Sequence, residues 1–264
     1  MKLNIKNKIA LIGGASKGLG KASAISLAKE GVNLAICSND QESLLQTTEY
    51  IKSNYGVEVL PILADLSEVH KIEKDVVEKV LEKYGRIDIL VTNSGGPKPG
   101  SFFSLNEEDW RIAFDSVLYY VVELYRLVIP YMEDNKWGRI INNTSLTVKD
   151  PPETMVLSNV FRTGVVSLAK TMSKGLIKSS ITINNICPGA FKTDRAIQLM
   201  QASAYSLGKT IEEVEKNSVA NLPMGKYQSP DEFGTLVAFL ASDHARSITG
   251  TTIQLDGGIS NGLL

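Results

Sequence analysis

The sequence predicts one doubly wound α/β domain, in which helices cover both faces of a parallel sheet. Short apolar runs alternate with helix-like stretches along the 264-residue chain, as in proteins built from strand–helix–strand units. The apolar runs are continuous rather than alternating, which is typical of strands buried on both faces. No linker, repeat or low-complexity tract divides the chain, so we expect a single domain over residues 1–264.

The first part of the chain supplies four strands and three helices. Residues 8–12 are a short apolar run that ends at Gly13, and helical periodicity follows over 19–30 until Gly31 stops it. The next strands are again apolar runs, and the next helices are amphipathic stretches. By these criteria we expect strands over 33–37, 58–63 and 87–92, and helices over 41–55 and 68–84.

The second part continues the same alternation. A long helix is expected over 107–135; it carries more apolar side chains, Tyr119 and Tyr120 among them, than one face needs, which indicates a packed interface. Apolar runs and helical periodicity then predict strands over 138–143, 181–187 and 251–255, and helices over 157–178 and 231–241.

One segment breaks this rhythm. Residues 193–228 form a long, mostly helical insertion before the helix at 231–241. Insertions of this size in a compact domain usually form lids or binding elements, and a purely structural excursion is the alternative. Four apolar residues predict an apolar face, suited to an apolar or elongated substrate or to packing as core: Leu199, Met200, Tyr205 and Leu207.

Composition and charge are ordinary for a globular protein. Hydrophobic residues make up 43% and charged residues 22% of the chain, and its net charge of −1, without a long basic run, gives no support for binding nucleic acid or a membrane surface. No secretory or membrane-spanning apolar run is present, so a cytoplasmic location is expected. Cys37 and Cys187 lie in apolar runs and are expected to be reduced and buried. His70 and His244 are isolated, so no metal site is expected.

A glycine-rich turn joins the first strand to the first helix. Gly14, Gly18 and Gly20 allow the backbone to turn tightly and to approach a pyrophosphate, and the free N–H groups of the helix point at it. Open α/β sheets bind ligands at this carboxyl edge. The turn therefore predicts a dinucleotide site, and a turn without a ligand is the alternative.

The pattern Gly-x-x-x-Gly-x-Gly at this place resembles that of the short-chain dehydrogenase/reductase family, whose members have a Rossmann fold. Four further landmarks follow in order: Asp65-Leu66, the pair that contacts adenine in the family; Asn93-Ser94-Gly95-Gly96, similar to its Asn-Asn-Ala-Gly; Pro188-Gly189 with Thr193, which holds the nicotinamide carboxamide; and Asp256-Gly257-Gly258. The resemblance covers nearly the whole chain and is strongest to 3-oxoacyl-carrier-protein reductases and glucose dehydrogenases.

The resemblance implies an oxidoreductase that transfers a hydride between a nicotinamide cofactor and a carbonyl or alcohol carbon. It also implies a homo-oligomer, a tetramer or a dimer. The positions that it assigns to the cofactor are Gly14, Ser16, Lys17, Gly18, Leu19, Gly20, Ser38, Asn39, Asp65, Leu66, Asn93, Gly95, Arg162, Pro188, Gly189 and Thr193.

The end of the second strand favours NADP(H) over NAD(H). A carboxylate there binds the ribose 2′-OH of NAD and repels a 2′-phosphate, but this position is Ser38, followed by Asn39. Lys17 stands in the glycine turn, where NADP users often keep a base that pairs with the phosphate. Asp40 is close enough in sequence to intrude, although the strand register argues against it. NAD(H) remains the second candidate.

The catalytic pattern of the family is only partly present. Ser145 matches the serine that polarises the carbonyl, but the positions of the usual Tyr and Lys are Ser158 and Arg162, and the position of the usual Asn is Val117. A serine hydroxyl is a poor acid, and an arginine is always protonated and cannot relay protons. Arg162 can still donate to the nicotinamide ribose or to a substrate anion.

Two functions follow from this loss. The first is a divergent reductase, in which Ser145 and Arg162 polarise the carbonyl and the proton comes from water, the substrate or a displaced tyrosine such as Tyr119 or Tyr205. Tyr205 and Lys209 also match Tyr-x-x-x-Lys, but they lie in the insertion and are not expected to be the true pair. The second is a non-catalytic NADP(H)-binding scaffold or redox sensor. Fold alone does not decide between them.

Overall fold

The computed structural model describes residues 2–262 and confirms the doubly wound sheet. Seven parallel strands follow the order β3-β2-β1-β4-β5-β6-β7. Their bounds are β1 Ile9–Ile12, β2 Asn33–Ser38, β3 Val59–Leu63, β4 Ile89–Thr92, β5 Gly138–Asn143, β6 Ile181–Pro188 and β7 Thr252–Leu255. The order reverses between β1 and β4, so the ligand-binding crevice is expected at the carboxyl ends of these two strands.

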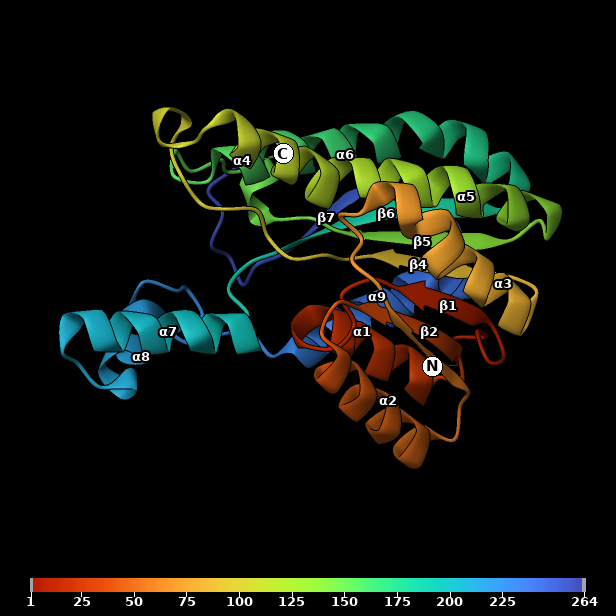
Figure 1. The fold of residues 1–264 in the computed structure, drawn as a ribbon, viewed down its shortest axis with the longest axis horizontal. Coiled ribbons are helices and arrows are strands. Elements are labelled where there is room, and N and C mark those ends of the chain that lie inside the picture. Colours follow the sequence, from red (N-terminus) through yellow and green to blue (C-terminus); the bar gives the residue numbers. More distant parts are fainter. Residues whose placement is uncertain (1, 263–264) are drawn as a thin grey trace.

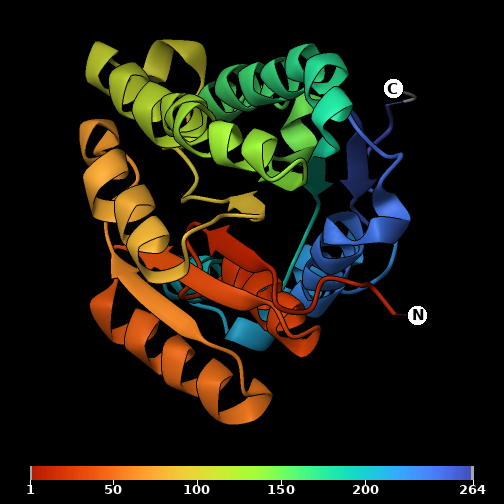
Figure 2. The ribbon, with the colours of Figure 1, turned by 90° about the vertical axis from the view of Figure 1, so that its right-hand side faces the viewer.

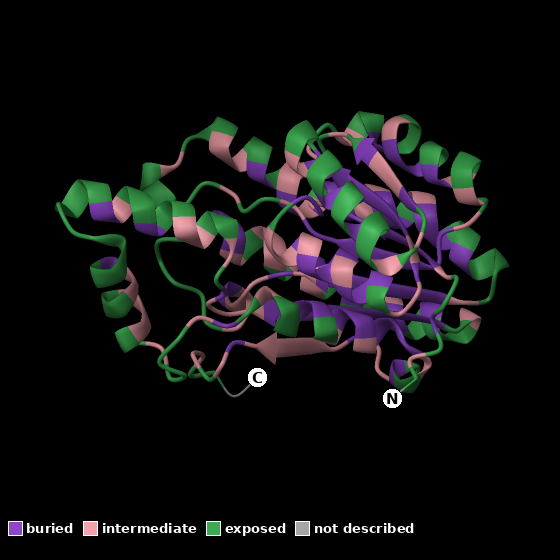
Figure 3. Ribbon diagram, turned by 90° about the horizontal axis from the view of Figure 1, so that it is seen from below, coloured by how far each residue is buried: buried purple, intermediate pink, exposed green. Residues whose placement is uncertain are grey.

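Helices cover both faces of the sheet (Figure 1, Figure 2). One face carries α1 (Gly18–Lys29), α2 (Gln41–Tyr55) and α9 (Pro230–Ala241). The other carries α3 (Glu78–Tyr84), α4 (Glu107–Ala113), α5 (Tyr120–Asp134) and α6 (Val156–Leu176). Each face buries its own apolar cluster against the strands, of which β1, β2, β4, β5 and β6 are buried almost throughout, whereas the edge strands β3 and β7 are partly exposed (Figure 3). Burial on both faces explains why the strands are continuously apolar.

Two of the expected helices are not regular α-helices. The segment predicted as one helix over 68–84 consists of a 3₁₀ turn at Val69–Lys71, a π-helical segment at Glu73–Val77 and α3. The long helix over 107–135 contains a π-helical segment at Phe114–Tyr119, between α4 and α5. A π turn adds residues to the helix without ending it, so the apolar periodicity did not reveal it.

The insertion contains two helices, α7 (Asp194–Leu207) and α8 (Ile211–Ala220), which lie to one side of the layers (Figure 1). Of the four apolar residues predicted to share a face, only Met200 packs as core. Met200 is buried with Ala204 and Val214, whereas the side chains of three residues are 59%, 93% and 62% exposed: Leu199, Tyr205 and Leu207. Residues 200 and 204 share one side of α7, whereas Leu199 and Tyr205 lie on other sides, and Leu207 is exposed at the end of the helix.

Three of the simpler expectations concern the cysteines, membrane-spanning helices and metal sites. Cys37 and Cys187 are both free and buried, as the sequence predicted, and burial raises the pKa of Cys37 to about 12. Among residues 2–262, no helix is long and apolar enough to cross a bilayer, and no three His, Cys, Asp or Glu side chains gather as a metal site.

Candidate functional site

The glycine turn forms a cradle between β1 and α1. Gly14 and Gly18 both have φ of +53°, a left-handed conformation that glycine adopts without strain. A Cβ atom on Gly20 would lie against the carbonyl oxygen of Gly14 and 2.7 Å from Nδ2 of Asn93. Asn93, at the end of β4, donates from that nitrogen to the carbonyl oxygens of Gly13 (3.0 Å) and Gly14 (3.1 Å). The cradle is therefore rigid and tied to the neighbouring strand.

The cradle opens on one side into a cleft of about 240 Å³ at the ends of β2 and β3. Ser38, Asn39, Asp65 and Leu66 line it together with Gly14 and Gly95, as the family resemblance implies for the adenosine end. The hydroxyls of Ser16 and Ser38 are 2.8 Å apart, and Nδ2 of Asn39 donates to Asp65 (3.1 Å). These polar side chains hold one another in place.

Lys17 lies in the glycine turn, but its ammonium is not a free cation. Its Nζ is 2.7 Å from Oδ2 of Asp40, which also caps α2 by accepting from the backbone N–H of Ser43. The hydrogen bond from Lys17 holds the pKa of Asp40 at about 2. The expectation that the strand register keeps Asp40 away is therefore wrong: its backbone lies beyond β2, but its side chain reaches back across the glycine turn.

The other side of the cradle leads to Ser145, Ser158 and Arg162, which the fold brings together. Oγ of Ser145 accepts from the backbone N–H of Thr147 (3.2 Å), and the hydroxyls of Thr147 and Ser158 are 3.1 Å apart. Nη1 of Arg162 donates to the carbonyl oxygens of Asn143 and Thr144, each at 3.0 Å. Thr147 thus links the two serines, and Arg162 is fixed beneath the loop that carries Ser145.

Electrostatics connect Arg162 to a tyrosine on the neighbouring helix. Burial lowers the pKa of Arg162, and the nearby phenol of Tyr120 opposes that shift. Burial raises the pKa of Tyr120, while Ser94, Arg162 and Thr92 lower it. Tyr120 follows the π-helical segment that contains the buried Val117. The phenol of Tyr120 on α5 and the guanidinium of Arg162 on α6 therefore influence each other's protonation.

A second cleft of about 330 Å³ runs from the glycine turn to Asn143 and the start of α7. It is lined by Gly14, Lys17, Gly18, Leu19, Asn93, Ser94, Gly95, Gly96, Asn143, Thr193, Asp194, Arg195 and Gln198. Asn143 donates from Nδ2 to Oδ1 of Asn93 (2.6 Å), and its own buried Oδ1 has no hydrogen-bond partner within the described chain. An unsatisfied acceptor beside a cleft is poised for a ligand donor.

Comparison with known proteins decides the family. The family model described as enoyl-(acyl carrier protein) reductase matches residues 14–260. The chain belongs to the short-chain dehydrogenase/reductase family. The 3-oxoacyl-[acyl-carrier-protein] reductase of Thermotoga maritima is 30% identical over 262 residues, which cover 97% of this chain and 99% of the relative. The uncharacterized oxidoreductase YvrD of Bacillus subtilis is 32% identical over 267 residues, the full length of both.

Solved structures of the family agree. The L-sorbose reductase of Gluconobacter frateurii, in complex with NADPH and L-sorbose, superposes with a TM-score of 0.96 at 28% identity and full coverage of both chains. YwfH, an NADPH-dependent reductase of bacilysin biosynthesis, superposes with a TM-score of 0.90 at 28% identity, over 98% of this chain and 100% of the other.

Within this short-chain dehydrogenase/reductase fold, the tyrosines named as substitutes lie in different surroundings. Tyr205 is 93% exposed on α7, and Tyr119 is 37% exposed and stacks on Phe114. Pro188 ends β6 and Gly189 follows it, where a Cβ would lie 2.6 Å from Cα of Asp256. The backbone at this edge is closely packed, which fixes the approach to Thr193.

Sequence reasoning missed the contact of Asp40 with Lys17, and it assigned no role in the site to Asn143, Tyr120, Asp194 or Arg195. Asn143 ends a buried strand, and a polar residue at that place was the available signal. Tyr120 stood in a row of apolar residues, and Arg195 stood in an insertion without a motif, so neither carried a signal of its own.

Proposed function

We propose that the protein is an NADP(H)-dependent short-chain oxidoreductase of carbonyl or alcohol substrates, similar to 3-oxoacyl reductases, with an atypical proton donor. The observation that carries this proposal is the fixed cation of Arg162, which holds the carbonyl oxygens of Asn143 and Thr144 just before Ser145, next to the cleft that the glycine turn and Asn143 line. Support comes from relatives of the same length that are described as reductases, among them an NADPH complex. A cytoplasmic location is part of the proposal.

The residues present fit a dinucleotide. The left-handed turn at Gly14 and Gly18 presents the start of α1 to a pyrophosphate, the lack of a side chain on Gly20 lets α1 pack closely against Gly14 and Asn93, and Oδ1 of Asn143 is free to accept from the nicotinamide carboxamide or ribose. Ser38 and Asn39 place no carboxylate of their own at the 2′ position. When bound, the nicotinamide supplies the hydride.

The side chains then divide the remaining chemistry. Ser145 donates its hydroxyl proton as a hydrogen bond to the carbonyl oxygen, and Arg162 stabilises the negative charge that develops there. Arg162 stays protonated, so the proton comes from water or from Tyr120, whose raised pKa keeps the phenol protonated at neutral pH. Ser158 holds Thr147, and through it the loop of Ser145, in position.

The test is turnover with defined variants. The protein is mixed with NADPH and a panel of ketones that includes acetoacetyl thioesters, and the absorbance of reduced nicotinamide is followed. Arg162→Ala and Ser145→Ala are each expected to lower kcat about 100-fold or more, since each removes a group that stabilises the developing charge. The exposed Ser53→Ala and Arg246→Ala serve as controls. Unchanged turnover in both site variants would contradict the proposed roles.

The second candidate is a non-catalytic NADP(H)-binding scaffold or redox sensor. It is favoured by the loss of the usual phenol and ammonium at Ser158 and Arg162 and by the buried Val117, which cannot hold a relay water through its side chain. Tight NADPH binding without turnover on any substrate of the panel would select this candidate over the reductase.

The ion pair of Lys17 predicts how the cofactor preference is set. Lys17→Ala is expected to weaken NADPH binding about tenfold and to leave NADH binding unchanged, because only NADPH carries the 2′-phosphate. Asp40→Asn, which keeps an N-cap acceptor, is expected to strengthen NADPH binding, because the lysine loses its competing anion. Fluorescence titration of the bound reduced nicotinamide measures both.

The same ion pair fixes the pH dependence. The pKa of Asp40 is depressed to about 2, so the carboxylate stays charged far below neutral pH and the pair with Lys17 persists. The ratio of NADPH to NADH affinity is therefore expected to follow only the phosphate itself between about pH 5 and 8. If the ion pair does not titrate in this range, the ratio of NADPH to NADH affinity should change with pH in the same way in Lys17→Ala and in the parent protein. A different pH dependence in the two proteins would contradict the prediction.

We also propose a homo-oligomer, a tetramer or a dimer. The support is an apolar groove on α5 and α6, lined by Val122, Tyr125, Arg126, Ile129, Pro130, Leu168 and Met172. Surfaces of this kind are typical of contacts between subunits. Residues 193–228 are proposed as a lid-like insertion in a single-domain chain.

A further inference from the structure

Two consecutive side chains at the start of α7 lie in the cofactor cleft. Thr193 caps this helix through its Oγ1, which accepts from the backbone N–H of Ala196 (3.3 Å). The cap directs Asp194 and Arg195 toward the glycine turn, although 176 positions separate Asp194 from Gly18. The insertion therefore contacts the cleft through two opposite charges.

The carboxylate of Asp194 accepts a hydrogen bond from a backbone amide of the glycine turn, which could otherwise donate to a bound anion. Its Oδ2 accepts from the backbone N–H of Gly18 (3.1 Å), the first residue of α1. Lys17, the N-cap of α1, makes no capping bond within residues 2–262, and the first turn of α1 has no acidic residue. The positive end of the helix is thus satisfied by a distant carboxylate, at the place where a pyrophosphate is expected. A carboxylate and a phosphate compete for this position.

Arg195 lies across the same cleft. Its Nη1 is 3.2 Å from the position that a Cβ on Gly96 would occupy, so the guanidinium covers the loop after β4. Its charge reaches far enough to lower the pKa of Arg162. Over the part of the chain that the structure describes, Arg195 has neither an ion-pair nor a hydrogen-bond partner. An unpaired guanidinium facing a phosphate cradle is suited to bidentate pairing with phosphate oxygens.

We propose that Asp194 and Arg195 form a charge latch on the cofactor cleft. Asp194 holds the start of α7 against Gly18 in the empty protein. The entering dinucleotide displaces this carboxylate from Gly18, and Arg195 pairs with the pyrophosphate, so that the insertion closes on the cofactor. This inference rests on the proposed binding of NADP(H), and it adds a competing anion and a clamping cation that belong to the insertion.

The two charges have opposite expected effects, which a pair of isosteric or near-isosteric variants separates. Arg195→Gln is expected to weaken NADPH binding about tenfold, because it removes a charge-assisted contact to the pyrophosphate. Asp194→Asn is expected to strengthen NADPH binding severalfold, because a neutral amide competes less well for the N–H of Gly18. Calorimetric titration with NADPH measures both, and Arg246→Gln, at an exposed arginine that does not line the cleft, is the matched control.

A ligand without the pyrophosphate localises the effect. Adenosine 2′-monophosphate, used as a competitor of NADPH, is expected to bind Arg195→Gln and the parent protein equally well. Melting curves without ligand check that the variants are folded.

Each outcome bears on one proposal. If the parent protein binds no NADPH, the proposed function fails. If the parent binds it and Arg195→Gln binds it as tightly, or if Asp194→Asn weakens binding, the latch is overturned while the cofactor site stands. An equal loss of 2′-monophosphate affinity in Arg195→Gln would also overturn it, because the arginine would then act on the whole cleft.

Discussion

Gly20→Ala is expected to lower the affinity for NADPH about 100-fold and to destabilise the protein by about 1–3 kcal/mol. The added methyl group would meet the carbonyl oxygen of Gly14 and lie 2.7 Å from Nδ2 of Asn93. Neither atom can retreat easily, because Asn93 Nδ2 also holds the carbonyl oxygens of Gly13 and Gly14. The start of α1 must therefore move away from the strand ends, and the phosphate cradle moves with it.

Gly175→Ala is the matched control for this variant. Gly175 lies near the end of α6, and a Cβ there would meet nothing within 4 Å. Alanine is preferred to glycine inside a helix by about 0.5–1 kcal/mol, so this variant is expected to be slightly more stable and to bind NADPH normally. Titration with NADPH and urea unfolding measure the two effects. Normal cofactor binding by Gly20→Ala would contradict the close packing of the turn.

The parallel sheet was predictable because the pattern that specifies it, apolar strands alternating with helices, can be recognised segment by segment in the sequence. Each strand is a continuous apolar run, and each strand before β7 is followed by a helical crossover that returns over a covered face, so composition and order together determine a parallel sheet. The π-helical segments were not predictable in the same way. At Phe114–Tyr119 the chain keeps helical rotation and apolar content while it changes its hydrogen-bond spacing, which leaves little trace in the sequence.

The parts of the clefts that depend on the backbone were predictable, because only glycine fits there. The parts formed by side chains that contact residues far away in the sequence were less so. Gly14 and Gly20 are recognisable because no other residue fits their contacts. The pairing of Asp40 with Lys17 depends on the direction of two flexible side chains, and that of Asp194 with Gly18 on the path of an insertion. Such partners are set by tertiary structure, which the spacing of residues in the sequence does not encode.

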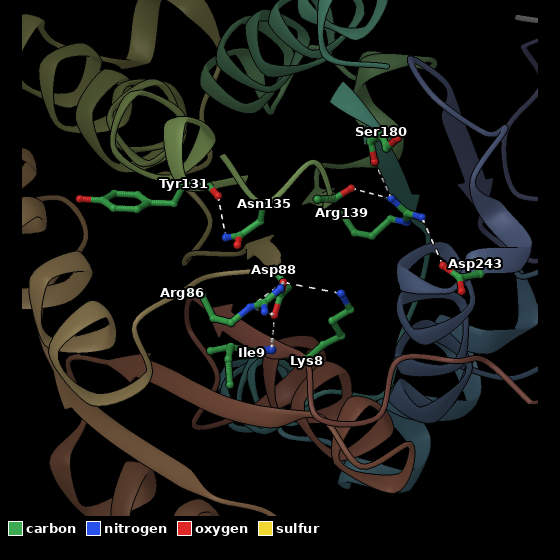
Figure 4. Close-up of polar contacts among 10 residues, drawn as sticks. Lys8, Ile9, Arg86, Asp88, Tyr131, Asn135, Arg139, Ser180 and Asp243 are labelled. Carbon is green, nitrogen blue, oxygen red and sulfur yellow. Dashed lines mark hydrogen bonds and ion pairs between the residues drawn. The ribbon is translucent and has the colours of Figure 1, made fainter. Parts of the chain in front are cut away.

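The largest effect on stability is expected at the opposite, amino-terminal edge of the sheet, at Asp88. Its side chain is fully buried and accepts the backbone N–H of Ile9 (2.9 Å). Nε of Arg86 donates to both carboxylate oxygens (3.1 and 3.0 Å), and Nζ of Lys8 lies 3.8 Å away (Figure 4). One carboxylate thus joins the starts of β1 and β4, the two strands that flank the switch point.

Asp88→Ala is expected to lower the free energy of unfolding by about 3–5 kcal/mol, because it leaves the N–H of Ile9 buried without a partner and two cations without their anion. Asp88→Asn keeps one acceptor for Ile9 and is expected to cost less than Asp88→Ala. Urea unfolding at a fixed protein concentration measures both, and the exposed Asp134→Ala, expected to change stability by no more than about 0.5 kcal/mol, is the control. Because Asp88 lies at the edge away from the cradle, the affinity of the folded variants for NADPH is expected to be unchanged.

A stability of Asp88→Ala equal to that of Asp134→Ala would show that solvent replaces these contacts. A selective loss of NADPH binding without a loss of stability would place the role of Asp88 in the cofactor site instead of in the joining of the two strands.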